Sequence, residues 1–183
     1  MSNLPTPGTY AIDPSHSSVG FAVRHFGLAR VRGEFTSFEG SLTIDPDPAA
    51  SAVSVTIQAD SFDSRDEGRD THVRSADFLN VESHPTLTFT STGIRQDGDD
   101  WIVTGDLTVR GTSRSVELRT SFDGEIDDPY GMGRVAFSAS TRIDRTDFGL
   151  TWNQTLETGG LVVGKQVDIT LEVEAVRPLG EGA

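Results

Sequence analysis

The chain has 183 residues and is acidic, with 28 Asp and Glu residues against 15 Lys and Arg residues and a formal net charge of −13. This charge disfavours nucleic acid as a partner, because binding rests on neutralising phosphates with basic groups, and disfavours a peripheral place on anionic lipid for the same reason. The length fits one domain with a core that needs no covalent staples. Because cysteine is absent, disulfides and thiolate metal sites are excluded.

The ends of the chain predict location and domain limits. The opening residues, MSNLPTPGTY, lack the basic start and apolar core of a signal peptide, and no run of about eighteen apolar residues occurs. We therefore expect a cytoplasmic protein with no stable membrane insertion. One domain is expected over residues 8–177, with frayed termini over residues 1–7 and 178–183.

Period-two alternation of apolar and polar residues dominates the chain. Val53, Val55 and Ile57 alternate with polar neighbours, and the same pattern covers residues 101–109, 116–122, 135–143 and 167–174. One apolar and one polar face on each strand is typical of antiparallel sheets that are wet on one side. With turn signals between the runs, the pattern predicts an all-β chain of about eight or nine strands.

The strands could form either a sandwich or a closed barrel. Long strands favour a tilted, closed sheet. Small residues on the expected inner face also favour a hollow barrel, because they leave room inside; these are Gly105, Thr120, Ala139 and Thr141. We therefore predict an antiparallel β-barrel of about eight strands with a short helical insertion.

The helical insertion is expected within residues 60–92, where the alternation stops. Ser64 and Glu67 have the spacing of a capping box, which predicts a helix that runs to about Arg74. A second short turn, capped by Ser75, would direct Phe78 and Leu79 back toward the sheet. A polar helix with an apolar hook predicts a lid over one end of the barrel.

A second flexible segment is expected near a barrel mouth. Residues 152–165 contain three glycines and form a candidate second gate. Just before them, Asp144 and Asp147 flank Arg145, which predicts an ion-paired strand end, and Phe148 is expected to point inward.

The ionisable residues predict neither catalysis nor metal binding. The four histidines, His16, His25, His72 and His84, lack the spacing of a ligand motif, and no GxSxG elbow is present. On the helix, Arg65, Arg69 and Arg74 are expected to pair with Asp63, Asp66 and Asp70. For His25, at the end of an apolar stripe, two interpretations stay open: a hydrogen-bonded rim residue, or a contact to a polar head group.

Five blocks resemble one known family, in order along the chain. They are IDPSHSSVGFAVRHFGLARVRGEFTSFEGSLTID, SFDSRDEGRDTHVRSADFLNVESHPTLTFTST, WIVTGDLTVRGTSRSVEL, FSASTRIDRTDFGL and VGKQVDITLEVEAV. Together they span about Tyr10 to Val176, and they resemble the YceI-like family of polyisoprenoid-binding, lipocalin-like proteins. The resemblance implies a β-barrel that encloses a long isoprenoid chain.

The expected function is non-covalent binding, storage or transport of a long apolar lipid, with no enzymatic activity, cofactor or metal. Two alternatives stay open: an enzyme that acts on an isoprenoid diphosphate, and a stress-related interaction module with a filled barrel. A homodimer is one of the assemblies we consider. The predicted ligand-binding residues are Phe21, Val23, His25, Phe35, Val55, Ile57, Phe78, Leu79, Leu87, Phe89, Trp101, Val103, Phe137, Ala139 and Phe148.

Overall fold

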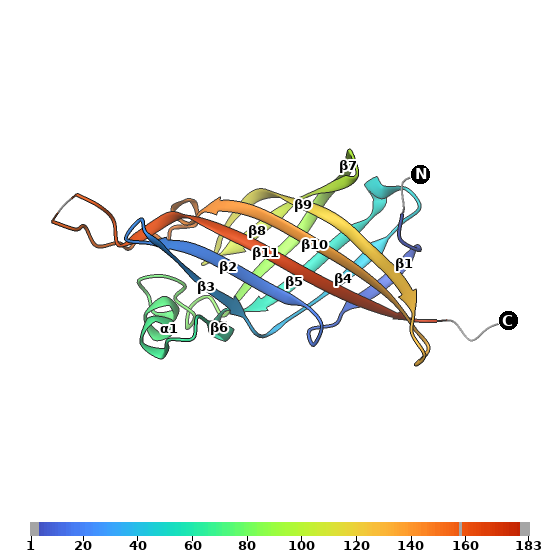
Figure 1. Cartoon of the computed structure of the whole chain (residues 1–183), viewed down its shortest axis with the longest axis horizontal. Helices are drawn as coiled ribbons and strands as arrows, with labels where there is room; N and C mark the ends of the chain where they lie inside the picture. Colours follow the sequence, from blue (N-terminus) through green and yellow to red (C-terminus); the bar gives the residue numbers. More distant parts are fainter. Residues whose placement is uncertain (1–3, 158, 180–183) are drawn as a thin grey trace.

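The computed structural model describes residues 4–157 and 159–179. Within these ranges, eleven strands make one antiparallel sheet, and eight of them close into a barrel (Figure 1). The helix is α1 (Glu67–Arg74), and three short 3-10 turns are η1 (Pro48–Ala50), η2 (Ala59–Ser61) and η3 (Arg145–Phe148). The strands are β1 (Gly8–Ile12), β2 (Ser18–His25), β3 (Ala29–Phe35), β4 (Phe38–Ile44), β5 (Ala52–Gln58), β6 (Phe62–Asp63), β7 (Thr86–Asp97), β8 (Asp100–Val109), β9 (Thr112–Asp127), β10 (Met132–Asp144) and β11 (Val163–Pro178).

The barrel closes through the long strand β11. The ring runs β1, β4, β5, β7, β8, β9, β10, β11, and the pairing of Ala11 with Val176 joins its ends. Farther along the same edge of β11, β2 becomes the partner strand, from Glu172 opposite Ser18 toward the start of β11. The strands β2, β3 and β6 therefore extend one end of the barrel beyond the closed ring.

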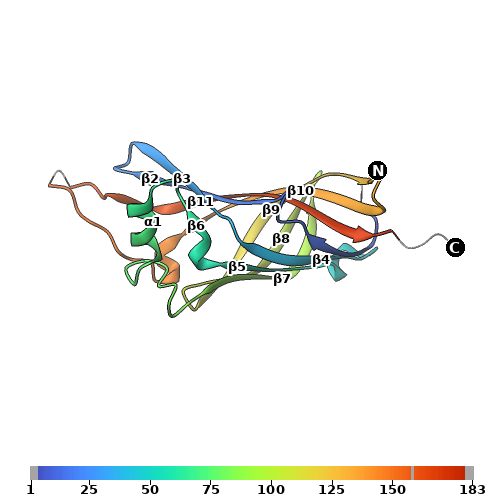
Figure 2. The same ribbon diagram turned by 90° about the horizontal axis from the view of Figure 1, so that it is seen from below.

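Helix α1 lies at this extended end. Figures 1 and 2 both place it beside β6, and the segment from α1 leads back into the ring at β7. Since β6 ends one branch of the sheet, the helix and the turn after it cover the side where strand pairing stops. We call residues 64–85, which carry α1, the lid.

The predicted inward-facing residues of the strands lie on the inner side of the barrel. The prediction that Gly105 leaves free room there is the exception. On β8, Trp101 and Val103 are buried on the inner side. A Cβ atom built on Gly105 would lie 2.4 Å from the ring of Phe89. The expectation that Gly105 leaves free room is therefore wrong, because Phe89 from the neighbouring strand occupies that space.

The buried apolar residues form two clusters, one at each end. The larger cluster joins the lid residues Phe78 and Leu79 to the barrel wall and to Phe148. The smaller cluster lies at the closing seam around Tyr10, Leu42, Val135 and Ala175.

The segment before Tyr10 contacts the barrel, because the Thr6 amide donates to the Glu125 carboxylate at 2.8 Å. Of the residues expected to fray, 1–3 and 180–183 lie outside the described residues.

The helix start differs from the prediction. Asp66, not Ser64, caps α1, and its carboxylate accepts a hydrogen bond from the Arg69 amide at 2.9 Å. Ser64 is buried instead, and both its amide and its hydroxyl donate to the buried carboxylate of Asp70. The capping-box prediction is wrong because the contact with Asp70 holds Ser64 in the segment before the N-cap residue Asp66. The predicted end of the helix at Arg74 is confirmed.

The expected ion pairs on the helix are also wrong. Arg69 donates to the hydroxyl and the carbonyl of Ser64, both at 2.7 Å. Arg74 donates to the carbonyl of Phe62 and lies 3.8 Å from Glu67. Arg69 and Arg74 therefore bind the backbone of β6 and of its connection to α1, and not the aspartates next to them in sequence.

The Asp70–Ser64 contact predicts that Asp70→Ala will loosen the lid. Removing the carboxylate leaves the Ser64 amide buried without an acceptor, so we expect the free energy of unfolding to fall by about 2 kcal/mol. Amide exchange in α1 should rise more than in the barrel strands. As a control, Asp77→Ala removes a half-exposed carboxylate that pairs with His72 and should cost about 0.5 kcal/mol. Equal losses in the two variants would contradict this role of Asp70.

Candidate functional site

The barrel encloses an apolar cavity of about 640 Å³ that runs from the lid to the opposite end. This volume falls within the range of roughly 300–1,000 Å³ that small-molecule pockets occupy. Side chains from the ring, from β2 and β3, and from the lid contribute to its wall. An interior lined in this way is hollow rather than packed.

Every residue that the sequence predicted for ligand binding lies on the wall of this cavity. These are Phe21, Val23, His25, Phe35, Val55, Ile57, Phe78, Leu79, Leu87, Phe89, Trp101, Val103, Phe137, Ala139 and Phe148. The strand alternation brings together those from the sheet, and the lid adds Phe78 and Leu79, which are both buried. Their contact with a ligand stays a prediction.

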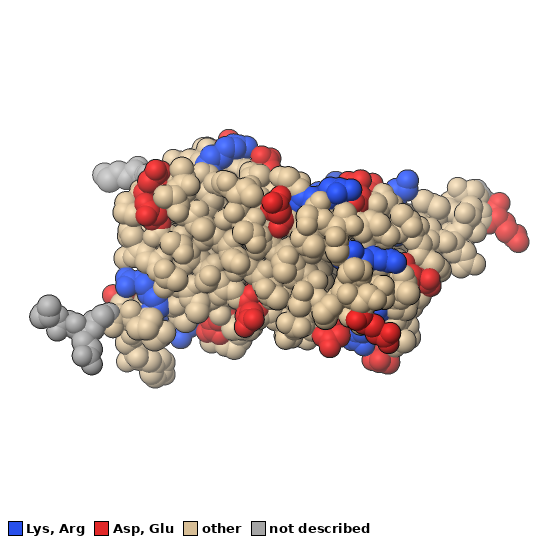
Figure 3. Space-filling model, turned by 180° about the vertical axis from the view of Figure 1, so that it is seen from behind, with Lys and Arg blue, Asp and Glu red and all other residues tan. Residues whose placement is uncertain are grey.

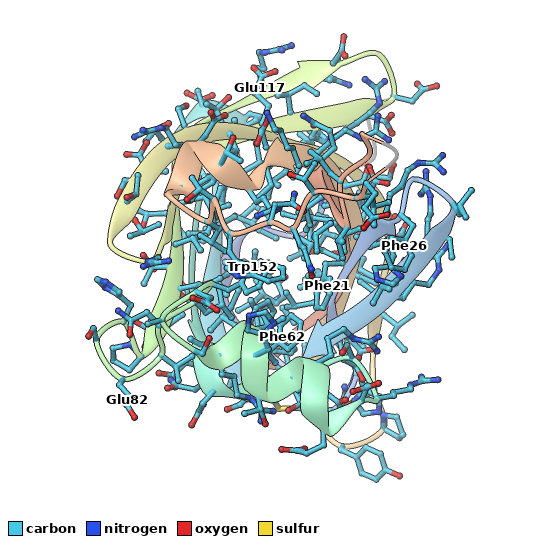
Figure 4. All side chains as sticks on the ribbon, turned by 90° about the vertical axis from the view of Figure 1, so that its left-hand side faces the viewer. Phe21, Phe26, Phe62, Glu82, Glu117 and Trp152 are labelled. Atoms are coloured by element: carbon cyan, nitrogen blue, oxygen red, sulfur yellow. The ribbon has the colours of Figure 1, made fainter. Side chains whose placement is uncertain are left out.

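Several wall residues were absent from that prediction. Ile169 and Leu171 on β11 also line the cavity, and the alternation of residues 167–173 was a sufficient signal for them. Phe62 and Trp152 lacked such a signal, because Phe62 lies in the two-residue strand β6 and Trp152 lies in the loop before β11. The ring of Phe62 stacks on Phe21 with centroids 4.8 Å apart. Figure 4 shows Phe21, Phe62 and Trp152 around the interior at the lid end.

The lid and the loop before β11 form one aromatic cover. The Trp152 ring lies 5.3 Å from the Phe78 ring and 4.6 Å from the His72 ring, edge to face in the second case. The loop predicted as a second gate therefore packs against the lid at the same end of the cavity. Thr158, within that loop, lies outside the described residues.

Arg145 holds the base of this loop. The expectation of an ion-paired strand end is wrong, because the buried guanidinium donates to backbone carbonyls of the loop and of β11. The acceptors are Leu150 at 2.6 Å, Trp152 and Gly164 at 2.9 Å, and Val163 at 3.3 Å. Burial lowers the pKa of Arg145, and the nearby Asp144 opposes that shift. Phe148 points inward and is buried, as predicted.

Charged side chains and imidazoles on the cavity wall lie at its two ends. At the lid end the wall includes Arg24, His25, Arg69, His72 and Arg145, and at the other end it includes Asp45. The long middle section is formed mainly by aliphatic and aromatic side chains, with Thr120 and Thr141 among them. This arrangement suits a long apolar molecule with a polar group at one end.

One group in the described ranges has the geometry to hold a metal ion. Ligand atoms of Asp13, His16 and Glu174 lie within 4.8 Å of one another outside the barrel. Arg134 already occupies this group, since its guanidinium hydrogen-bonds Glu174 and lies 3.3 Å from Asp13. Hydrogen bonds from Ser15 and His16 hold the pKa of Asp13 well below its usual range. The cluster is therefore an ion-pair network at the barrel seam, and a cation would have to displace Arg134.

The fold and the cavity define a class: closed, antiparallel, lipocalin-like β-barrels with a hollow apolar interior and a helical lid. The sequence profile of the YceI-like domain matches residues 10–175, and the chain belongs to the YceI-like family. No helix in the described ranges is long and apolar enough to cross a membrane.

Relatives agree in sequence and in structure. Protein YceI of Escherichia coli O17:K52:H18 is 40% identical over 171 residues, which cover 92% of this chain and 86% of that protein. The crystal structure of BcnA from Burkholderia cenocepacia superposes with a TM-score of 0.78 at 23% identity, covering 89% of this chain and 98% of BcnA. A polyisoprenoid-binding domain from Saccharophagus degradans, implicated in plant cell wall breakdown, has a TM-score of 0.66 at 14% identity and covers 92% of this chain and 98% of that domain. The predicted barrel is confirmed.

Proposed function

We propose that this protein binds a long-chain isoprenoid or a similar apolar lipid non-covalently inside the barrel, for storage or transport. The observation that carries the proposal is the lidded cavity of about 640 Å³, whose wall is apolar over most of its length. Apolar surface removed from water gains roughly 25 cal/mol per Å², so a tail that fills this cavity binds mainly through burial. The description of the Saccharophagus degradans neighbour as polyisoprenoid-binding supports the choice of an isoprenoid.

The composition of the wall favours binding over catalysis. An enzyme that acts on an isoprenoid diphosphate needs inward carboxylates or histidines that hold a metal. Among the described wall residues the acidic member is Asp45, at the end opposite His25 and His72. These groups cannot converge on one reacting atom, which supports a binding protein. The hollow interior likewise supports a ligand over the alternative of a filled interaction module.

The test is extraction of freshly purified protein with organic solvent, followed by mass spectrometry. We expect one long-chain lipid per chain in near-stoichiometric amount, because apolar cavities readily take up apolar guests. Chelators should change neither the melting temperature nor ligand uptake. Ligand-free protein from several expression hosts that also takes up no added polyprenol would refute the proposal.

Two finer parts of the proposal concern location and assembly. The absence of cysteine is compatible with a reducing cytoplasm, where we expect the protein to act. A homodimer is the assembly to be tested, by light scattering on the ligand-bound protein. Export of the protein, or a monomer at all concentrations, would correct these parts and leave lipid binding intact.

A further inference from the structure

Large apolar side chains are exposed beside the lid end of the cavity. The β2–β3 hairpin ends with Phe26, which is 45% exposed, and Leu28, which is 82% exposed, and Leu161 in the neighbouring loop is 41% exposed. The Phe26 amide donates to the Val162 carbonyl at 2.9 Å, which ties the hairpin tip to this loop. We call Phe26, Leu28 and Leu161 the apolar rim. In Figure 4, Phe26 lies on the hairpin, away from the interior side chains. Exposed apolar groups gathered in this way mark an interaction surface.

The turn that presents Phe26 is conformationally unfavourable for that residue. Phe26 and Gly27 have φ values of 54° and 70°, and the Leu28 amide donates to the His25 carbonyl at 3.0 Å. A β-turn with both central residues at positive φ favours Asn–Gly. A bulky aromatic residue is uncommon there. Turn stability therefore does not explain Phe26, and a backbone outlier of this kind points to a function.

The rim borders the cavity directly. Arg24 and His25, just before the hairpin tip, line the cavity, and so do Val162 and Val163, just after Leu161. A lipid that enters or leaves at the lid end must pass these residues. This step rests on the proposed function, because it assumes that the cavity holds a lipid.

The charge around the rim differs from that of the chain as a whole. Arg24, Arg30, Arg32 and Lys165 are exposed on the hairpin and at the start of β11. Of these four residues, Arg30 forms an ion pair within the described part of the chain, with Asp168 at 2.9 Å. An anionic surface is therefore attracted to the hairpin, although the net charge of −13 predicts the opposite for the protein as a whole.

The opposite end also exposes apolar side chains, but in acidic surroundings. Ile126 and Tyr130 are exposed there, and Glu125, Asp127 and Asp128 are their neighbours in the chain. Arg134 pairs with Asp128 there, but Glu125 and Asp127 leave this end without an excess of positive charge, so it attracts an anionic bilayer less than the hairpin does. In Figure 3 a narrow arm with acidic groups at its tip extends from one end of the barrel, and acidic and basic groups intersperse along the body. Charge thus distinguishes the two ends.

We propose that the apolar rim docks the lid end onto a lipid bilayer that contains anionic lipid. Phe26 and Leu28 enter the interface, while Arg24, Arg32 and Lys165 lie at the level of the head groups. Lipid then passes between the bilayer and the cavity without crossing water. The rim is a small wedge on a three-residue hairpin loop and the neighbouring loop, which suits insertion among head groups better than a protein interface of about 800 Å² per partner.

The main test is flotation of the full-length protein with vesicles of equal parts phosphatidylcholine and phosphatidylglycerol. Wild-type protein should float, and Phe26→Asn combined with Leu28→Ser should weaken binding about tenfold or more. Because Asn–Gly suits the turn, the melting temperature should stay the same or rise. Arg24→Gln and Arg32→Gln should each weaken binding about fivefold on these vesicles but not on pure phosphatidylcholine. Ile126→Ser with Tyr130→Ser is the matched control and should bind as wild type does.

A second measurement separates this proposal from the proposed function. The rim variant should take up detergent-dispersed polyprenol as wild type does, while its uptake from vesicles falls. Normal uptake from detergent with no wild-type flotation would overturn bilayer docking and leave lipid binding intact. If Phe26→Asn also abolished dimerisation in that case, the rim would be a contact between proteins. Equal flotation of wild type and rim variant would overturn the proposal as well.

Discussion

Ala139→Phe should abolish ligand uptake while the free energy of unfolding of the ligand-free protein changes by less than about 1 kcal/mol. Ala139 lies on β10 between Thr120 and Leu171 of the neighbouring strands, and all three side chains line the cavity. In a packed core, such an insertion typically costs about 1–3 kcal/mol. Here the new ring enters the space that the lipid tail would occupy, so the loss falls on binding.

The matched control for this variant is Ser138→Phe, one residue earlier on the outer face, where the Ser138 hydroxyl donates to Asp123. It should spare uptake. Native mass spectrometry with added polyprenol and thermal melting of delipidated protein measure the two effects separately. Strong destabilisation of the ligand-free protein by Ala139→Phe would favour a filled barrel and contradict the lipid-binding proposal.

Arg145→Met should lower the free energy of unfolding by about 3–5 kcal/mol, the largest effect we expect from a single substitution. Methionine has a similar reach but cannot donate to the four carbonyls that Arg145 binds. Hydrogen bonds from a charged group contribute roughly 1.5–3 kcal/mol each, and the loop regains part of this from water. The loop between η3 and β11 should then detach from the lid, which urea unfolding and amide exchange would detect.

The control for Arg145 lies three residues earlier. Arg142 is exposed and pairs with Asp168 on the outer face. Arg142→Met should therefore cost about 0–1 kcal/mol, as is usual for a surface ion pair. Comparable losses in the two variants would indicate that Arg145 contributes charge alone and not the anchoring of the loop.

Much of the barrel and of its cavity follows from local pattern. The alternation at residues 53–57 or 167–173 separates an inner from an outer face without any knowledge of neighbours, because successive side chains in a strand point to opposite sides. For that reason the predicted wall residues of the sheet all lie on the cavity. Alternation could not show that β1 and β2 share one edge of β11, because strand pairing depends on residues far apart in the chain.

The predictions that proved wrong concern polar groups and small residues whose partners are remote. Ser64 has the spacing of a helix cap, yet the buried carboxylate of Asp70 binds it. Arg145 has acidic neighbours in sequence, yet it donates to carbonyls of a loop up to 19 residues away. Gly105 suggests free space, yet Phe89 of the adjacent strand fills it. In each case, the nearest residues in the chain are not the nearest in space.

The all-β class, the helical insertion, the buried hook of Phe78 and Leu79, and the inner faces at residues 53–57, 101–109, 116–122, 135–143 and 167–174 could all be predicted from the sequence alone. These features depend on the local geometry of strands and turns, which a few consecutive residues specify. Only the tertiary structure decided how the ring closes, how large the cavity is, and how Arg145 joins loop and barrel. It alone placed the strained Phe26 turn beside the cavity mouth, because a cavity and its entrance exist only where distant segments meet.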